Sequence, residues 1–337
     1  MKKRNKTVTL ILGRGFSESL FGLPSNLRLS REIFKSYENL CEYQYWLTGI
    51  GSLSMLEVSN RRRFLQSDFL TCQYEPYDLL SPINKKKYEK MFYSNSTSVG
   101  TFNRFRSSLI ETLYSQLSLK TRRFDSRKCD EFIMMLESFI DKGHTVNIFD
   151  LNLDLGVETL IKSSDFSSKY EDGFGEVFDD YTPGVPPGCS KFEGFSSNKL
   201  IHHYKPNGSL RFLHEVADTV FKLTNEGMES EFYTPNTLSR THNAICPPVN
   251  ERFQLSENYE YYSYTYKKLL ESMIDQNDLI LFDYNFGDTY LNSLLSNLYD
   301  IKTDEYEVGE LIVKTKSRSV KNTLKSLQFD NQSLLLC

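Results

Sequence analysis

Residues 7–17 read TVTLILGRGFS. The first six side chains are β-branched or leucine, as in a buried strand, and Gly13 and Gly15 mark a tight turn. Residues 16–21 then have the composition of a helix start. Strand, glycine turn and helix form the first unit of an α/β fold, in which the helix N-terminus favours a phosphate. A plain tight turn explains the glycines at least as well. Glu18 replaces the third glycine of the dinucleotide fingerprint G-x-G-x-x-G, which disfavours a simple dehydrogenase site.

Three further apolar runs predict strands, and each is followed by a polar loop: Thr145–Phe149, Lys199–Lys205 and Asp278–Phe282. A helical segment around 257–275 precedes the last of them. Strands that alternate with helices predict an α/β fold with a Rossmann-like parallel sheet. Ligand chemistry is then expected at the carboxyl edge of that sheet.

Three other segments surround these strands. Residues 30–143 have apolar side chains at intervals of three and four, which predicts a large, mainly helical insertion that uses these stripes for core packing. Residues 164–199 are rich in Gly, Ser, Pro and Asp and predict an irregular excursion. Residues 296–337 form a C-terminal extension whose acidic and basic pieces indicate no function.

Composition excludes several classes of protein. The 337 residues include 40 Lys and Arg against 44 Asp and Glu, so a net charge of −4 gives no general attraction to nucleic acid or to an anionic membrane. The six cysteines are scattered without a C-x-x-C pair, which predicts no structural zinc site and a reducing, cytoplasmic setting with free thiols. No apolar run approaches a secretory h-region or the ~18 residues of a membrane span.

Motif segments follow one another in a definite order. They are GRGFS at 13–17 with GLPS at 22–25, DLNLD at 150–154 with Glu158, YKPNGSL at 204–210, CPP at 246–248 and DYNFGD at 283–288. This order resembles the sirtuin-like NAD-binding domains of bacteria, with their segments G-A-G-F-S…G-[IL]-P-S, T-x-N-Y-D, K-x-H-G-S-L, P-P and G-Y-S-F-x-D. The resemblance covers about residues 7–295 and predicts a single sirtuin-like domain over 1–337.

The resemblance implies NAD as ligand or substrate, without a metal. It implies contacts with the pyrophosphate and ribose for Gly13, Gly15, Phe16, Ser17 and Ser209, and contacts on the adenosine side for Tyr284, Asn285 and Asp288. Arg14, within the first of these segments, is a further candidate for binding the cofactor. It implies catalytic positions near the nicotinamide ribose for Asn152, Asp154 and Asn207. Proteins of this type resemble NAD-cleaving effectors of antiphage defence, so a second copy of the chain or a defence-complex protein is an expected partner.

Three positions depart from the family pattern. Asn207 stands where the family has the His of K-x-H-G-S-L, and a carboxamide cannot take a proton from a ribose hydroxyl near neutral pH. Arg14 replaces Ala, and its guanidinium would pair with the pyrophosphate or fill the pocket. Asp283 replaces Gly, which places a carboxylate near a diphosphate unless a cation neutralises it. An Arg14–Asp283 ion pair in the nucleotide site is a further alternative.

The histidines nearest to this site are His202 and His203, four or five residues before Asn207 on a predicted strand. Because side chains alternate along a strand, only one of the two can face a given side. For each, a structural hydrogen-bonding role is favoured over a role as general base. For Asn152 and Asp154 taken alone, a turn held by side-chain-to-backbone bonds is the favoured interpretation.

Two functions remain open. The first is an NAD glycohydrolase with Asn152 as its main surviving catalytic residue, which would position polar groups around an oxocarbenium-like ribose. The alternative is a catalytically impaired pseudoenzyme that binds NAD or ADP-ribose, or serves as a scaffold subunit. Protein deacylation as in zinc-bearing sirtuins is disfavoured, because the C-x-x-C pairs of the zinc module are lacking.

Overall fold

The computed structural model describes residues 6–25, 28–29, 32, 112–119, 122–178, 188–214, 219–223, 242–245, 259–274, 278–284, 291–295, 311–314 and 332–333. Most of the predicted insertion at 30–143 lies outside the described residues. So do Asn285, Asp288, the CPP segment and most of the C-terminal extension.

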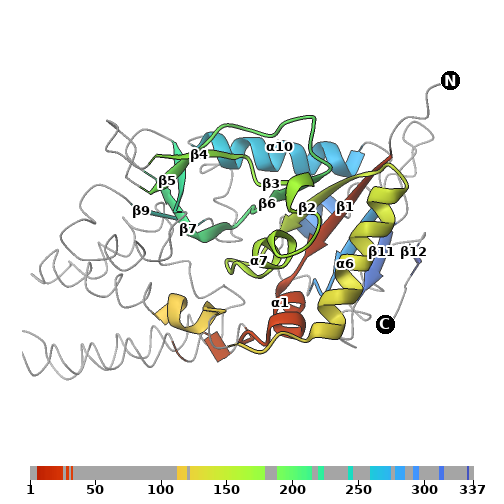
Figure 1. Cartoon of the computed structure of the whole chain (residues 1–337), viewed down its shortest axis with the longest axis horizontal. Helices are drawn as coiled ribbons and strands as arrows, with labels where there is room; N and C mark the ends of the chain where they lie inside the picture. Colours follow the sequence, from red (N-terminus) through yellow and green to blue (C-terminus); the bar gives the residue numbers. More distant parts are fainter. Residues whose placement is uncertain are drawn as a thin grey trace, which may run out of the picture.

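A parallel sheet forms the centre of the molecule (Figure 1). Its strand order is β12-β11-β10-β1-β2-β6-β3, and every neighbouring pair is parallel. The strands are β1 (Thr7–Leu12), β2 (Thr145–Asp150), β3 (Tyr170–Glu171), β6 (Ile201–Tyr204), β10 (Asp278–Phe282), β11 (Leu311–Lys314) and β12 (Gln332–Ser333). The predicted α/β fold with a Rossmann-like parallel sheet is confirmed.

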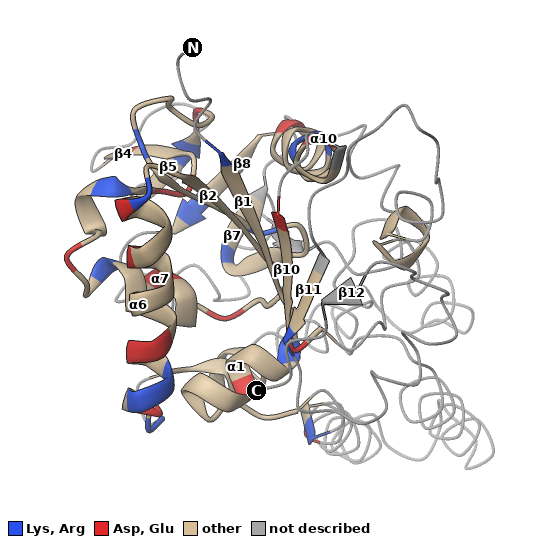
Figure 2. Cartoon of the chain, turned by 90° about the vertical axis from the view of Figure 1, so that its right-hand side faces the viewer, with Lys and Arg blue, Asp and Glu red and all other residues tan. Residues whose placement is uncertain are grey.

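Helices cover both faces of this sheet. Figure 2 shows α6 (Ser126–Asp141) and α7 (Gly156–Lys162) on one side and α10 (Glu260–Ile274) on the other. The first face packs the buried residues of α1 (Arg14–Phe21), α6 and α7 against alternate residues of the central strands, such as Leu10 and Ile148. The opposite face packs α10 against Ile11, Phe149 and Leu281. A central strand that is buried on both faces explains why β1 is apolar apart from Thr7 and Thr9.

A second, antiparallel sheet lies beside the first, with the order β4-β5-β8-β7-β9. Its strands are β4 (Phe174–Phe178), β5 (Cys189–Phe192), β7 (Gly208–His214), β8 (Val220–Leu223) and β9 (His242–Ile245). A short 3-10 turn, η2 (Ser167–Lys169), precedes β3.

The prediction of an irregular excursion over 164–199 is wrong, because β3, β4 and β5 all lie within it. Phe174 and Phe192 are held by aromatic packing against Tyr261 of α10, with ring centroids 5.6 and 5.0 Å away. Local composition favoured a loop, but these tertiary contacts outweigh local propensity.

The two sheets are joined directly by the chain. Residues 205–207 link β6 of the parallel sheet to β7 of the antiparallel sheet, and Gly208 has a φ of 83° at the start of β7. Only glycine adopts this backbone conformation readily. The predicted Asn207 position therefore lies at the junction of the two sheets.

Among the described helices, none is both long enough and apolar enough to cross a membrane.

Candidate functional site

Four adjacent strands bring the predicted site segments together. Because β10, β1, β2 and β6 are neighbours and parallel, the loops that follow them lie at one edge of the sheet. From β1 the sheet extends through β2 and β6 to one side and through β10 to the other, so the strand order reverses here. In open α/β sheets, ligands bind in the crevice at such a reversal.

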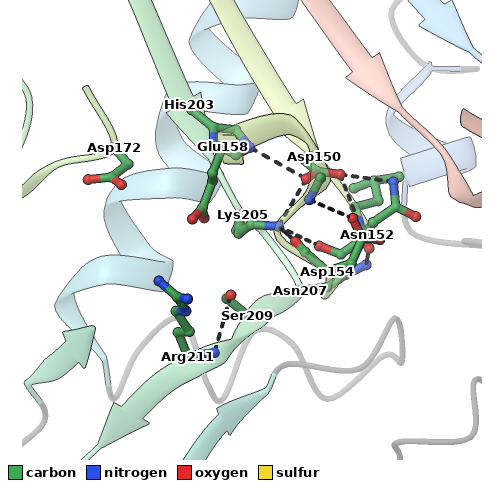
Figure 3. A network of polar contacts seen from close by, with 12 residues as sticks. Asp150, Asn152, Asp154, Glu158, Asp172, His203, Lys205, Asn207, Ser209 and Arg211 are labelled. Atoms are coloured by element: carbon green, nitrogen blue, oxygen red, sulfur yellow. Dashed lines mark hydrogen bonds and ion pairs between the residues drawn. The ribbon is translucent and has the colours of Figure 1, made fainter. Parts of the chain in front are cut away.

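Asp150 is the centre of a polar network at the end of β2 (Figure 3). Its side chain is fully buried, and Oδ1 accepts hydrogen bonds from the backbone N and Nδ2 of Asn152 at 3.0 and 2.9 Å. Oδ2 lies 2.9 Å from the Nζ of Lys205 and 3.5 Å from the Nε2 of His203. Burial alone would raise the pKa of Asp150, but Lys205 and His203 outweigh it and hold the pKa below its ordinary value.

Lys205 is a buried ammonium with three oxygen partners. Besides Asp150, its Nζ donates to the main-chain oxygens of Asn152 at 2.9 Å and Asp154 at 2.6 Å. Its backbone N donates to the Oη of Tyr261 on α10 at 2.9 Å. Sequence reasoning did not select Lys205 or Asp150 as site residues. The available signal was a lysine at the end of one predicted strand and an aspartate directly after another predicted strand of the same sheet.

Asn152 bridges two strand ends. Its Nδ2 donates to Asp150 and also to the main-chain oxygen of Gly13, at 3.1 Å, so one amide ties the β2 loop to the β1 turn. The side chain is buried. The interpretation of a turn held by side-chain-to-backbone bonds therefore describes Asn152 in this structure, at a position beside the predicted phosphate turn.

Asp154 is held at both carboxylate oxygens. Its Oδ1 accepts from the backbone N of Gly156 at 3.0 Å, and its Oδ2 lies 3.2 Å from the Nη1 of Arg14. Burial, and then repulsion from Asp150, raise the pKa of Asp154 despite the nearby Arg14. Two buried carboxyl groups four residues apart thus have pKa shifts of opposite direction, because Lys205 contacts the carboxylate of Asp150 and only the backbone of Asp154.

Arg14 turns toward the β2 loop. Its Nε and Nη2 both donate to the main-chain oxygen of Pro24, at 3.2 and 2.7 Å, while Nη1 contacts Asp154. Among the described residues Arg14 forms its ion pair with Asp154, so the alternative of an Arg14–Asp283 pair is wrong. The side chain of Asp154 is completely buried, and its ion pair with Arg14 joins the β2 loop to the β1 turn.

The glycines of the β1 turn have a packing role. A Cβ on Gly13 would collide with the main-chain oxygen of Asp283 and the Cα of Tyr284, and one on Gly15 would lie 2.8 Å from the Cβ of Asp283. Asp283 itself has a φ of 43°, a left-handed conformation in which glycine is favoured and Asp is tolerated. The β1 and β10 loops are therefore in direct backbone contact.

Ser17 and Phe16 follow this turn on α1. The Oγ of Ser17 is completely buried and has no hydrogen-bond partner in the described structure. The ring of Phe16 packs into the α6 face, 4.9 Å from the ring of Phe132 and 5.9 Å from that of Phe282. Ser17 is thus an unsatisfied donor in the predicted phosphate segment, whereas Phe16 contributes to the core.

The segment after β6 lies along the β2 loop. Asn207 is buried, and its Nδ2 donates to the main-chain oxygen of Leu151 at 2.8 Å. The backbone N of Leu210 donates to the main-chain oxygen of Leu153 at 3.1 Å. Between them, the Oγ of the buried Ser209 accepts from the backbone N of Arg211 at 3.3 Å. The structure therefore brings Asn152, Asp154 and Asn207 together, as the order of the motifs predicted.

The two histidines point in opposite directions from β6. The Nδ1 of His203 lies 2.9 Å from the Oη of Tyr170, and the ring is fully buried beside Asp150. The Nε2 of His202 lies 3.1 Å from Glu171 on the other face, and burial lowers the pKa of His202. Both have the structural surroundings that the sequence favoured.

On the β10 side, the Oη of the buried Tyr284 donates to the Oδ1 of Asn292 at 2.9 Å. A cavity of about 430 Å³ opens beside Asp283, between α1, α6 and the ends of β10 and β11. Phe16, Phe132 and Phe282 line it, together with Lys314, whose Nζ lies 5.1 Å from the centroid of the Phe282 ring. Ligand pockets typically have volumes of ~300–1,000 Å³.

A second buried lysine lies outside this edge. Lys222 of β8 contacts Glu158 of α7 at 3.1 Å and also pairs with Asp172, so it joins the two sheets. Burial alone would raise the pKa of Glu158, but Lys222, and then Lys205, hold it well below its ordinary value.

No protein-family model matches the chain, and no curated protein matches it in sequence. The sirtuin-like resemblance therefore depends on the ordered motifs, and it stays a prediction.

Proposed function

We propose that this chain binds NAD or ADP-ribose at the carboxyl edge of its parallel sheet, and that its capacity to cleave NAD is impaired. The observation that carries the proposal is the convergence of polar groups from three neighbouring strand ends, those of β1, β2 and β6, beside the point where the strand order reverses. That is the place where open α/β sheets bind nucleotides.

Two features fit a diphosphate. The orphan hydroxyl of Ser17 lies in the first turn of α1, and a buried donor without a partner costs about 1–3 kcal/mol, which a phosphate oxygen would offset. Arg14 supplies a guanidinium at the same turn, where it now contacts Asp154 and Pro24. In the proposed complex Arg14 and Ser17 bind the pyrophosphate, and the cavity beside Asp283 takes an adjoining part of the nucleotide.

Impaired cleavage follows from the groups around Asn207. A general base contributes about 10²–10⁴-fold to a rate, and the Asn207 amide, which donates to Leu151, cannot supply one. Neither His202 nor His203 is placed to substitute for it, because His202 pairs with Glu171 on the opposite face of β6 and the ring of His203 is fully buried between Tyr170 and Asp150.

The second candidate is an active NAD glycohydrolase, and one observation favours it. Asp154 is a buried carboxyl group with a raised pKa beside Asn152, and carboxyl groups with shifted pKa values cluster at catalytic sites. If this candidate is right, Asp154→Asn abolishes the release of nicotinamide. If the chain is impaired, the wild type already releases almost none.

The resemblance also supplies the proposed setting, a subunit of an antiphage defence complex that acts with a second copy of the chain or with another protein. Light scattering on the purified chain, alone and with ADP-ribose, measures the first of these. A monomeric mass in both conditions would contradict self-assembly.

Calorimetric titration of the full chain with NAD and with ADP-ribose, alongside chromatographic detection of nicotinamide, tests the function. We expect both ligands to bind and nicotinamide release to stay near background. Arg14→Gln should weaken binding, whereas Lys268→Gln, which removes a partly exposed ammonium paired with Glu271 on α10, should not. Absence of heat with either ligand would overturn the proposal.

The variant Asn207→His places an imidazole at the position where the family has its histidine. If the site binds NAD and lacks only a base, this variant should raise nicotinamide release about 100-fold. Asn152→Ala in the same background should remove the gain, because proton transfer without a positioned ribose lacks the required geometry. A variant that binds NAD but stays inert would show that a further group is missing.

A further inference from the structure

We propose that Lys205 is a positioning residue for this site: its ammonium holds residues 150–154 in the conformation that presents Asn152 to the ligand. The inference rests on the proposed function for the identity of the ligand, and on the geometry for the role of Lys205. The family resemblance gives no role to Lys205.

Three oxygens surround the ammonium of Lys205. A buried ion pair needs one carboxylate, yet Lys205 also donates to the main-chain oxygens of Asn152 and Asp154. These three contacts, between 2.6 and 2.9 Å, come from alternate residues of one loop. An ammonium has three donors, so the loop satisfies all of them and the lysine determines where each carbonyl group points.

A chain of contacts runs from Lys205 to the predicted phosphate turn. Lys205 pairs with Oδ2 of Asp150, and Oδ1 of the same carboxylate receives both the backbone N and Nδ2 of Asn152. Nδ2 of Asn152 then donates to Gly13. Displacing the ammonium therefore displaces the carboxylate that orients Asn152 against the β1 turn.

Helix α10 fixes the backbone from which the side chain of Lys205 extends. The backbone N of Lys205 donates to Tyr261, and the main-chain oxygen of Pro206 accepts from Tyr266 at 3.0 Å, so α10 holds both residues of this junction. The side chain of Lys205 is only 2% exposed. It acts on the ligand through the loop rather than by contact with it.

Lys222 offers a matched control. It is also a lysine with almost complete burial and two oxygen-bearing partners, but among the described residues those partners are the carboxylates of Glu158 and Asp172. In the described structure it forms no hydrogen bond or ion pair with residues 150–154. Loss of either ammonium leaves buried carboxylates unpaired and destabilises the fold, whereas only loss of Lys205 should alter the loop.

The experiment compares Lys205→Met with Lys222→Met, below the melting temperature of both. Calorimetry measures the Kd for ADP-ribose, and hydrogen–deuterium exchange measures the backbone of residues 150–156. We expect Lys205→Met to weaken binding at least about tenfold and to speed exchange in this segment. Lys222→Met should lower the melting temperature similarly, with a Kd within about twofold of the wild type.

Lys205→Arg covers the case in which Lys205→Met fails to fold. It keeps the charge and the pair with Asp150, but a planar guanidinium cannot direct its donors at the same three oxygens. We expect a folded variant with weakened binding and faster exchange at 150–156.

Two results are decisive against the role of Lys205. A folded Lys205→Met or Lys205→Arg with unchanged Kd and unchanged exchange would overturn it. If the wild type binds neither ADP-ribose nor NAD, the proposed function fails by itself. The exchange of residues 150–156 then still decides whether Lys205 holds the loop.

Discussion

The two buried lysines among the described residues, Lys205 and Lys222, lie in regions where the loss of the ammonium has different consequences. Lys205 is at the ligand edge, where two of its three partners are main-chain oxygens of one loop. Lys222 is at the contact between α7 and the second sheet, where its partners are carboxylates from separate elements. The same side chain, equally buried, shapes a loop in one region and joins layers in the other. A buried charged side chain therefore requires polar partners, and the kind of partner indicates whether the side chain positions a loop or joins two layers.

The largest expected effect is on stability at the layer contact. Lys222→Met leaves the buried Glu158 and the partly buried Asp172 without their cation, which should lower the free energy of unfolding by about 3–5 kcal/mol. Urea denaturation measures the change. The triple change Lys222→Met, Glu158→Gln and Asp172→Asn should recover much of the loss, because no unpaired charge remains. A loss below about 1 kcal/mol for Lys222→Met would mean that Lys222 does not stabilise the layer contact. The contrast between its role and that of Lys205 would then fail.

The next effect concerns the backbone contact between the β1 and β10 loops. Gly13→Ala sets a methyl group against the main chain of Asp283 and Tyr284 and should cost about 1–3 kcal/mol. Gly15→Ala meets the side chain of Asp283, which can move, so it should cost less. Thermal unfolding of both variants checks the order. The reverse order would contradict the packing role of Gly13.

The sequence predicted the strands that carry this edge because each is a short apolar run followed by a polar loop. β1, β2, β6, β10 and the helix α10 lie where they were expected. Since parallel strands align their carboxyl ends, the convergence of Asn152, Asp154 and Asn207 could also be predicted.

The second sheet and the role of Lys205 could not be predicted in this way. β4 and β5 are short and lie in glycine-rich sequence, and their stability comes from Tyr261 and other residues far along the chain. Burial of Lys205 depends on oxygens from the β2 loop, more than 50 residues earlier in the chain. Neither feature has a local signal.

Acid should weaken both clusters through their carboxylates. The pKa values of Asp150 and Glu158 are lower in the folded chain than their ordinary values near 4, so their stabilisation is present above about pH 4.5. It is lost as pH falls through the lower, folded values. Asp154 has the opposite sign, because its raised pKa means that protonation relieves a cost of burial.

Denaturation curves between about pH 3 and 7 measure this dependence. Glu158→Gln should flatten the acid limb, since it removes one of the two carboxylates with a lowered pKa. Asp154→Asn should leave the limb at least as steep as in the wild type. A steeper limb for Glu158→Gln would contradict the assignment.

The smallest expected effect is at Ser17. Without a ligand, Ser17→Ala removes an unpartnered buried hydroxyl and should stabilise the chain by up to about 1 kcal/mol. If a phosphate accepts from this hydroxyl, the same change should weaken ADP-ribose binding about tenfold. Ser163→Ala, at a hydroxyl that donates to Leu160 at the end of α7, is the control and should change neither property by much. Unchanged binding in Ser17→Ala would exclude Ser17 from the ligand site.

The central claim, a nucleotide site at the reversal point of the sheet, is tested most directly by hydrogen–deuterium exchange of the full chain with and without ADP-ribose. With ADP-ribose bound, we expect slower exchange in residues 13–17, 150–156 and 205–210. Exchange at the α7–β8 contact around Lys222 should be unchanged. Protection confined to other segments, or no protection at saturating ADP-ribose, would contradict it.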